Sequence, residues 1–98
     1  MTGRNANFIR QSCQIIISED EKKAIDIKII DISKISVLAD YFIIAGGSND
    51  RQVKALADNV EERLGKEGII AKSSEGYSNA KWILLDYQDV IIHIFNQE

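Results

Sequence analysis

The spacing of apolar residues predicts two amphipathic helices and five strands. The clearer helix runs from about residue 50 to residue 67, where apolar side chains recur every three or four positions: Val53, Leu56, Ala57, Val60 and Leu64. Asn49 suits the N-cap with Gln52 as its capping-box partner, and Gly68 supplies the C-terminal stop. This pattern predicts a helix with one face packed on a core.

The segment 7–23 fits two structures. Its apolar residues lie on one face of a helix, at Ile9, Cys13, Ile16 and Ile17. The run 15–17 would also suit a strand, but the alternation expected of a half-buried strand is missing. We therefore favour a helix, with residues 1–6 frayed before it.

Five segments predict strands: 25–32, 41–45, 69–71, 82–87 and 90–95. Alternating isoleucines predict one strongly buried face for the first, and the continuous apolar run of the second predicts an interior strand buried on both faces. The last two are close enough in sequence to require an antiparallel hairpin. The chain is therefore expected to be one α/β (α+β) domain over residues 1–98, in the order α-β-β-α-β-β-β, with helices packed on a mixed five-stranded sheet.

The length and net charge of the chain reduce the number of function classes that it could have. A chain of 98 residues with a net charge of −3 forms one domain and is a poor candidate for direct, specific nucleic-acid binding. Its apolar runs are too short to span a bilayer, and its first residues lack the apolar core of a signal peptide. Cys13 is the single cysteine, so no internal disulfide forms. We expect a cytoplasmic protein in a reducing compartment, without membrane contact.

Few residues could support catalysis. His93, the single histidine, is expected to point from its strand toward solvent or a neighbouring polar group. Cys13 lies on an apolar helical stripe and is expected to be a small buried side chain. The carboxylates show no metal-ligand spacing, so neither a metal nor a cofactor is expected.

Gly46-Gly47-Ser48 joins a predicted strand to a predicted helix, where backbone N–H groups can bind phosphate. The sequence matches neither a P-loop nor a dinucleotide fingerprint. Nucleotidyltransferases use a similar Gly-Ser step but need paired carboxylates on the next strand, and 69–72 contains none. A tight turn is favoured, and a nucleotide-binding or nucleotidyltransferase-like enzyme is kept as the alternative.

The charge imbalance lies at the C-terminal end. Residues 82–98 contain Asp86, Asp89 and Glu98 but no Lys or Arg, whereas the first 81 residues are neutral overall. Glu75, Tyr77 and Trp82 precede or open this segment. Aromatic anchors beside acidic groups suit a basic protein partner. The alternative is that Trp82 belongs to the core and the acids are merely solvated.

Several blocks of sequence resemble the ribosomal silencing factor family (Iojap-related proteins). The resemblance runs over roughly residues 8 to 95 without a gap and is carried by 26–33, 39–44, 48–55, 75–77 and 82–95. It implies a small mixed α/β fold with a nucleotidyltransferase-like outline but without the catalytic acids, hence a protein that is not an enzyme.

The resemblance also implies a function. Such proteins bind the large ribosomal subunit through a ribosomal protein on its joining face, block docking of the small subunit and reduce translation when nutrients are short. The family's tryptophan falls on Trp82 and its acidic hairpin on Asp86 and Asp89, with Tyr77 and Glu75 beside them. These five residues are the expected contacts with a basic ribosomal protein.

Two departures from the family pattern stand out. Gln88 replaces the usual hairpin glycine, which raises the cost of a positive φ by roughly 1 kcal/mol or selects another turn. The sequence stops at Glu98, where many members continue for a further helical segment. A homodimeric interaction module with a partner other than the ribosome remains a third interpretation.

Overall fold

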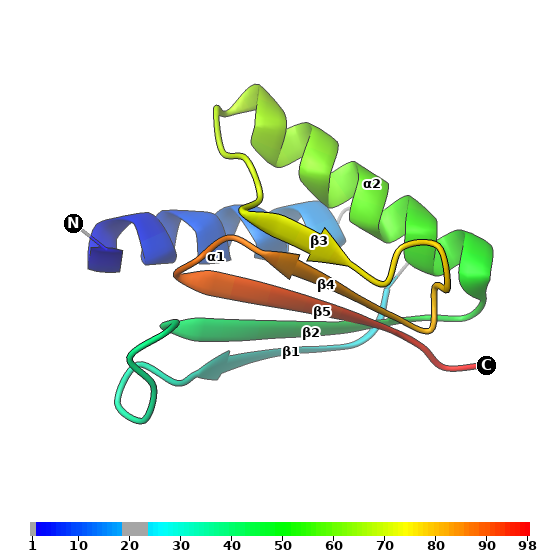
Figure 1. Cartoon of the computed structure of the whole chain (residues 1–98), viewed down its shortest axis with the longest axis horizontal. Helices are drawn as coiled ribbons and strands as arrows, with labels where there is room; N and C mark the ends of the chain where they lie inside the picture. The colour runs from blue at the N-terminus through cyan, green and yellow to red at the C-terminus, as the bar shows by residue number, and fades with distance from the viewer. Residues whose placement is uncertain (1, 19–23) are drawn as a thin grey trace.

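The computed structural model describes residues 2–18 and 24–98, and it confirms the predicted fold class and element order. Two helices lie against one face of a five-stranded mixed sheet, and the opposite face carries no helix (Figure 1). The elements are α1 (Thr2–Ser18), β1 (Ile25–Asp31), β2 (Tyr41–Gly47), α2 (Asp50–Lys66), β3 (Ser73–Glu75), β4 (Trp82–Asp86) and β5 (Val90–Asn96).

The first segment is a helix, as its apolar stripe predicted. Ile9, Cys13, Ile16 and Ile17 are all buried in the core. The helix begins at Thr2, earlier than the predicted start at residue 7, and fraying of its first residues stays a prediction. Residues 19–23, which the prediction included in the helix, lie outside the described residues.

The predicted helix over 50–67 is confirmed, together with both of its ends. The Asn49 side chain accepts a hydrogen bond from the Gln52 backbone N–H at 2.9 Å, and the Gln52 side chain accepts one from the Ser48 N–H. The cap at Asn49 is therefore as predicted, but the Gln52 side chain reaches the residue before the cap and not the Asn49 N–H of a reciprocal capping box. Gly68, at φ +81°, follows the Glu67 C-cap and allows the chain to turn away.

The sheet has the strand order β1-β2-β5-β4-β3. The central pair, β2 and β5, is parallel, and the other neighbouring pairs are antiparallel. The predicted hairpin joins β4 to β5. Alternate residues of β2, β4 and β5 pack under the helices, including the fully buried Ile43, Ile83, Leu85, Ile92 and Ile94.

Burial of the first two strands differs from the prediction. β1 lies at the sheet edge, and Ile25 and Ile27 are each 37% exposed, so no strongly buried face exists. β2 is interior as predicted, but only its helix-facing side is buried, and Phe42 and Ile44 on the other side are partly exposed. Both differences follow from the helices, which cover a single face of the sheet.

The third strand is also displaced from the prediction. Residues 69–71 are not a strand, because the Ile69 N–H donates to the Leu64 carbonyl and completes the end of α2. Pairing with β4 begins at Ser73 and ends at Glu75. Through the described part of the chain, no helix combines the length and apolar character needed to cross a membrane.

Candidate partner-binding site

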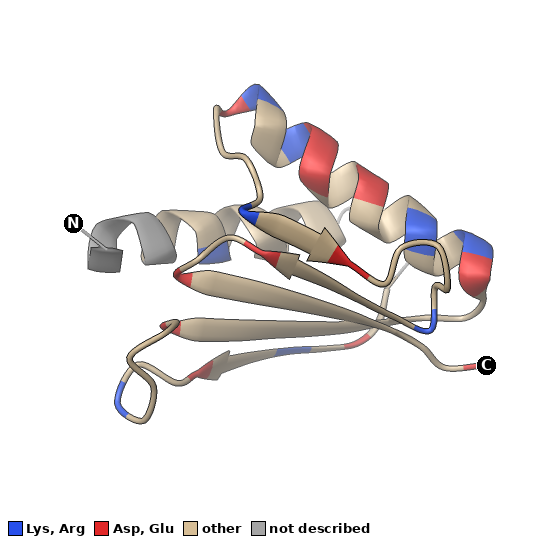
Figure 2. Ribbon diagram, in the orientation of Figure 1, with Lys and Arg blue, Asp and Glu red and all other residues tan. Residues whose placement is uncertain are grey.

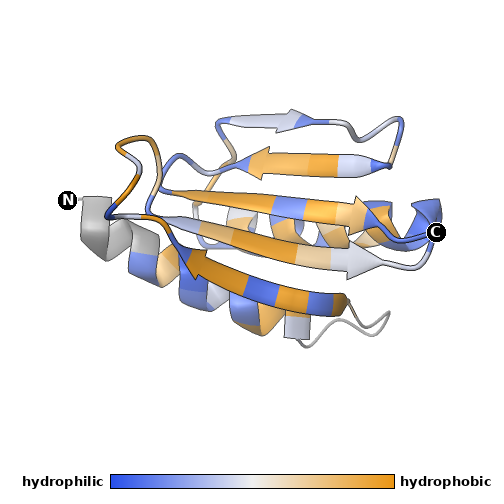
Figure 3. Cartoon of the chain, turned by 90° about the horizontal axis from the view of Figure 1, so that it is seen from below, coloured by the Kyte–Doolittle hydropathy of each residue, from blue (hydrophilic) through white to orange (hydrophobic). Residues whose placement is uncertain are grey.

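The uncovered side of the sheet, here named the open face, is defined by strand register. Because side chains alternate between faces and paired residues share one, a single set of residues points away from the helices. Figure 3 shows this side with the helices behind it. The open face consists of Lys28, Ile30, Phe42, Ile44, Gly46, Ser73, Glu75, Trp82, Leu84, Asp86, Ile91, His93 and Phe95.

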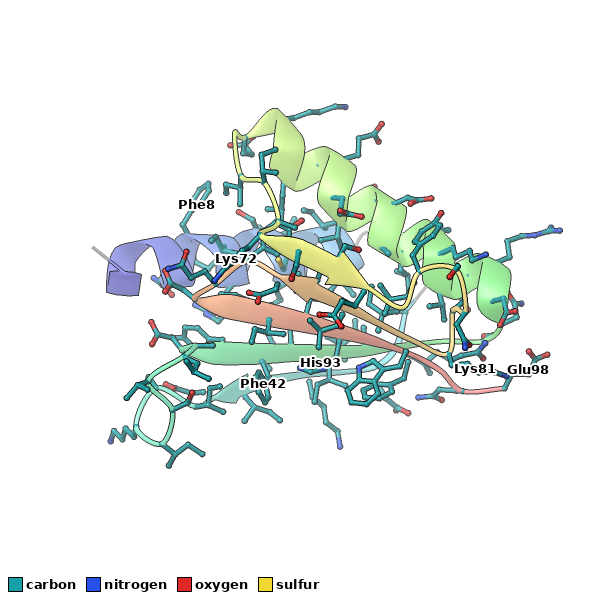
Figure 4. All side chains as sticks on the ribbon, viewed as in Figure 1. Phe8, Phe42, Lys72, Lys81, His93 and Glu98 are labelled. Atoms are coloured by element: carbon teal, nitrogen blue, oxygen red, sulfur yellow. The ribbon has the colours of Figure 1, made fainter. Side chains whose placement is uncertain are left out.

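Aromatic rings gather on the open face around Trp82. Trp82 is 51% exposed, which excludes the interpretation that it is a core residue. Its ring stacks on Phe95 with centroids 5.1 Å apart, and Phe42 meets His93 edge-on at 4.9 Å. Figure 4 shows Phe42 and His93 on the side of the sheet away from the helices. The cluster gives the surface a large apolar anchor that needs no folding step on binding.

His93 contacts this anchor directly. The indole Nε1 of Trp82 donates a hydrogen bond to His93 Nδ1 at 3.2 Å. Burial lowers the pKa of His93 below its usual value, because the charged ring would lose water contacts. The expectation that this histidine faces a neighbouring polar group is confirmed, and that group is the indole N–H.

Acidic groups lie at the end of β4 opposite Trp82, around the β4–β5 turn (Figure 2). Asp86 is fixed there because its Oδ1 accepts the Gln88 backbone N–H at 2.7 Å. The Asp89 carbonyl accepts the Asp40 N–H at 2.7 Å, which joins this turn to the loop before β2. Burial, followed by the nearby Asp40 charge, raises the pKa of Asp89.

The five sequence-predicted contacts do not all share one surface. Trp82, Asp86 and Glu75 lie on the open face, and Asp89 lies at the turn beyond its acidic end. Tyr77 instead faces α2. Its hydroxyl donates to Asp58 Oδ2 at 3.0 Å, which raises the Tyr77 pKa, and the Lys54 ammonium lies 5.4 Å from its ring. The structure therefore separates Tyr77 from the other four.

Sequence reasoning missed several exposed apolar residues. Phe42 was assigned to a strand buried on both faces and Phe95 only to a hairpin strand, yet both are partly exposed on the open face. The loop between β1 and β2 also exposes Ile35, Val37 and Leu38 almost completely, while its ends are anchored by buried Ile32 and Ala39. The alternation of burial in β5 was hidden because nearly every residue there is apolar.

The Gly46-Gly47-Ser48 segment is a packed turn. A Cβ on Gly47 would lie 2.7 Å from Val53 Cγ2, so glycine is needed for close packing of α2. The Gln52 side chain takes the Ser48 N–H, and Asn49 takes the Gln52 N–H, so these donors are not free for phosphate. Two strands separate β2 from Glu75, the single acid of β3. This geometry disfavours the nucleotidyltransferase alternative.

Within residues 2–18 and 24–98, no group of three or more His, Cys, Asp or Glu side chains could hold a metal ion. Cys13 is buried, and burial raises its pKa to about 12, so its thiol is not poised as a nucleophile.

Comparisons with known proteins identify a family and a set of relatives. A family model described as "Ribosomal silencing factor during starvation" matches residues 7–98. A ribosomal silencing factor of Bacillus subtilis is 40% identical over 79 residues, which is 81% of this chain and 67% of that protein. A chloroplastic Iojap protein of Zea mays is 28% identical over 75 residues, 76% of this chain and 32% of that protein.

Two solved structures resemble this fold. A crystal structure of a Bacillus halodurans protein superimposes with a TM-score of 0.85 and 32% identity, covering 94% of this chain and 84% of that one. A Chromobacterium violaceum protein gives a TM-score of 0.78 and 31% identity, covering 98% of this chain and 75% of that one. Both solved structures thus resemble this chain in fold and in sequence.

Proposed function

Because the chain belongs to the family of ribosomal silencing factors, we propose that its open face binds a basic ribosomal protein on the joining face of the large subunit. The bound protein then blocks docking of the small subunit and represses translation when nutrients are limiting. This role places it with ribosomes in the cytoplasm. The observation that carries the proposal is the exposed Trp82, which lies in an aromatic cluster on the one sheet face without helices.

The chemistry of the surface supports a protein partner. Apolar side chains fill the middle of the open face, and Glu75 and Asp86 lie toward its β3–β4 side. Aromatic anchors supply most of the binding energy in such interfaces, while surrounding charges steer the partner and set orientation. An acidic, apolar surface suits a basic ribosomal protein better than it suits ribosomal RNA phosphates.

The size of the molecule supports a steric mechanism. Its principal dimensions are 36 × 28 × 22 Å, so a molecule docked by one sheet face projects the two-helix layer outward. A rigid layer of this thickness on a subunit interface prevents the opposite subunit from approaching. No chemical step is required.

Sedimentation with separated ribosomal subunits tests the proposal. At moderate salt the protein is expected to pellet with large subunits, not with small subunits, and to reduce the yield of joined ribosomes. Reversing both charges, Asp86→Lys with Asp89→Lys, is expected to weaken binding, whereas Glu62→Lys on the exposed surface of α2 is expected to leave it intact. Absence of wild-type protein from the large-subunit pellet would refute the proposal.

A further inference from the structure

The Trp82–His93 hydrogen bond fixes the protonation state of the histidine. An indole nitrogen is only a donor, so His93 Nδ1 must be an unprotonated acceptor. The neutral ring then carries its proton on Nε2. That nitrogen is buried and has no hydrogen-bond partner among the described residues. The Trp82–His93 hydrogen bond therefore requires the neutral tautomer of His93 that is protonated on Nε2.

In the described part of the chain, aromatic and apolar side chains surround His93, and no carboxylate is hydrogen-bonded to it. Phe42 packs edge-on against the ring, and the Phe95 ring lies nearly parallel to it with centroids 6.3 Å apart. Its neighbour on β2, Ile44, is apolar. Among the described residues, no hydrogen bond joins His93 to the charged groups of this face or of its Trp82 end, which are Asp26, Lys28, Glu75, Lys81 and Asp86.

We infer that His93 is a positioning residue for partner docking: its neutral Nδ1 holds the Trp82 indole in one orientation on the open face, and protonation of His93 releases that ring. This inference rests on the proposed function, because it assigns the docking role to Trp82. It adds a residue that need not touch the partner, and it makes docking sensitive to acidification.

The physical reason is that protonation turns His93 Nδ1 from a hydrogen-bond acceptor into a donor. A protonated Nδ1 is a donor and would face the indole N–H, also a donor, so the hydrogen bond is lost. Burial lowers the pKa of His93 and so also favours the neutral ring that this hydrogen bond requires. A released ring must be reordered when a partner binds, which weakens affinity.

The isolated protein provides the first test, because the chain has one tryptophan and one histidine. The NMR signal of the Trp82 indole N–H should shift in a single titration as the pH falls from 8 toward 5. His93→Phe keeps an aromatic ring but removes the acceptor, and should place the signal at an unbonded position at every pH. His93→Asn keeps an acceptor atom near the Nδ1 position and should give a bonded signal independent of pH.

Binding to purified large subunits provides the second test, at pH 5.0 and pH 7.5, because a lowered pKa requires a more acidic solution to protonate His93. Wild-type affinity should fall about three- to tenfold at the lower pH, the factor expected for one hydrogen bond. His93→Phe should bind weakly at both pH values, and His93→Asn should bind at nearly wild-type strength at both. Thermal unfolding of each variant establishes that it is folded.

The outcomes separate this inference from the proposed function. Normal large-subunit binding with an indole signal insensitive to both pH and His93→Phe would overturn the positioning role alone. A full indole titration in protein that fails to bind large subunits at any pH would overturn the docking role together with the proposed function. Equal pH dependence in wild type and His93→Asn would also overturn the inference, because the sensitivity would then belong to another group.

Discussion

Gln88 adopts φ +74° in the β4–β5 turn, and its backbone N–H donates to the Asp86 carboxylate at 2.7 Å. The hairpin thus keeps the left-handed geometry expected of a glycine, although a larger residue occupies the position. The turn still directs Asp86 and links Asp89 to Asp40. The acidic end of the site is therefore held in a conformation that is strained at one residue.

Gln88→Gly is expected to stabilise the protein by about 1 kcal/mol, because glycine relieves the cost of the positive φ. Denaturant unfolding measures the change. Gln88→Ala is the matched control and should have little effect, since alanine keeps the strain. If the glycine variant is less stable than wild type, the Gln88 side chain stabilises the fold by more than its positive φ destabilises it.

Two glycines of the β2–α2 region should respond in opposite directions to alanine. Gly47→Ala is expected to cost about 1 to 3 kcal/mol, because its Cβ would lie 2.7 Å from Val53 Cγ2 and 3.2 Å from the Val53 nitrogen. Gly65→Ala should stabilise by about 0.5 to 1 kcal/mol, since a Cβ there meets nothing within 4 Å and the site is helical. Equal effects of the two substitutions in denaturant unfolding would contradict this packing.

Asp89→Asn is expected to stabilise the protein by about 0.5 kcal/mol at pH 7, because it removes the desolvation cost of the charged carboxylate and then the repulsion from Asp40. The raised pKa means that folded protein binds this proton more tightly than the unfolded chain. Its contribution to stability therefore falls as pH rises through the carboxyl range. The difference between variant and wild type should shrink as the pH is lowered toward 4, as thermal unfolding across pH can measure.

A double substitution controls for other effects of Asp89→Asn. Asp40→Asn should relieve the same repulsion, so the two changes together should stabilise less than the sum of the single changes. Fully additive effects would indicate that the two carboxylates act independently.

The sequence predicted the buried side of the fold well, for a physical reason. Helical periodicity reports which residues must leave water, and each residue of the two predicted stripes, such as Cys13 and Leu64, is buried. The predicted cap at Asn49 and stop at Gly68 also depend only on local chemistry. These features need no knowledge of the remaining chain.

The open face could not be predicted in the same way. An apolar strand residue such as Phe42 has the same sequence pattern whether a helix covers it or not, and only the placement of both helices on one side decides its exposure. Tyr77 was misplaced for a related reason: its proximity to Trp82 in sequence does not reveal that it bonds to Asp58 on α2. The start of β3 depends on its pairing with β4.

The claim that the open face docks on the large subunit is tested most directly by replacing two similarly exposed aromatic residues with alanine. The affinity of each variant for purified large subunits is then measured. Trp82 is 51% exposed on the open face, and Phe8 is 48% exposed on α1, which packs against the opposite side (Figure 4). Trp82→Ala should weaken binding about 30-fold or more, as loss of an anchor does, whereas Phe8→Ala should change it by less than about threefold. Equal losses, or a larger loss for Phe8→Ala, would contradict docking through the open face.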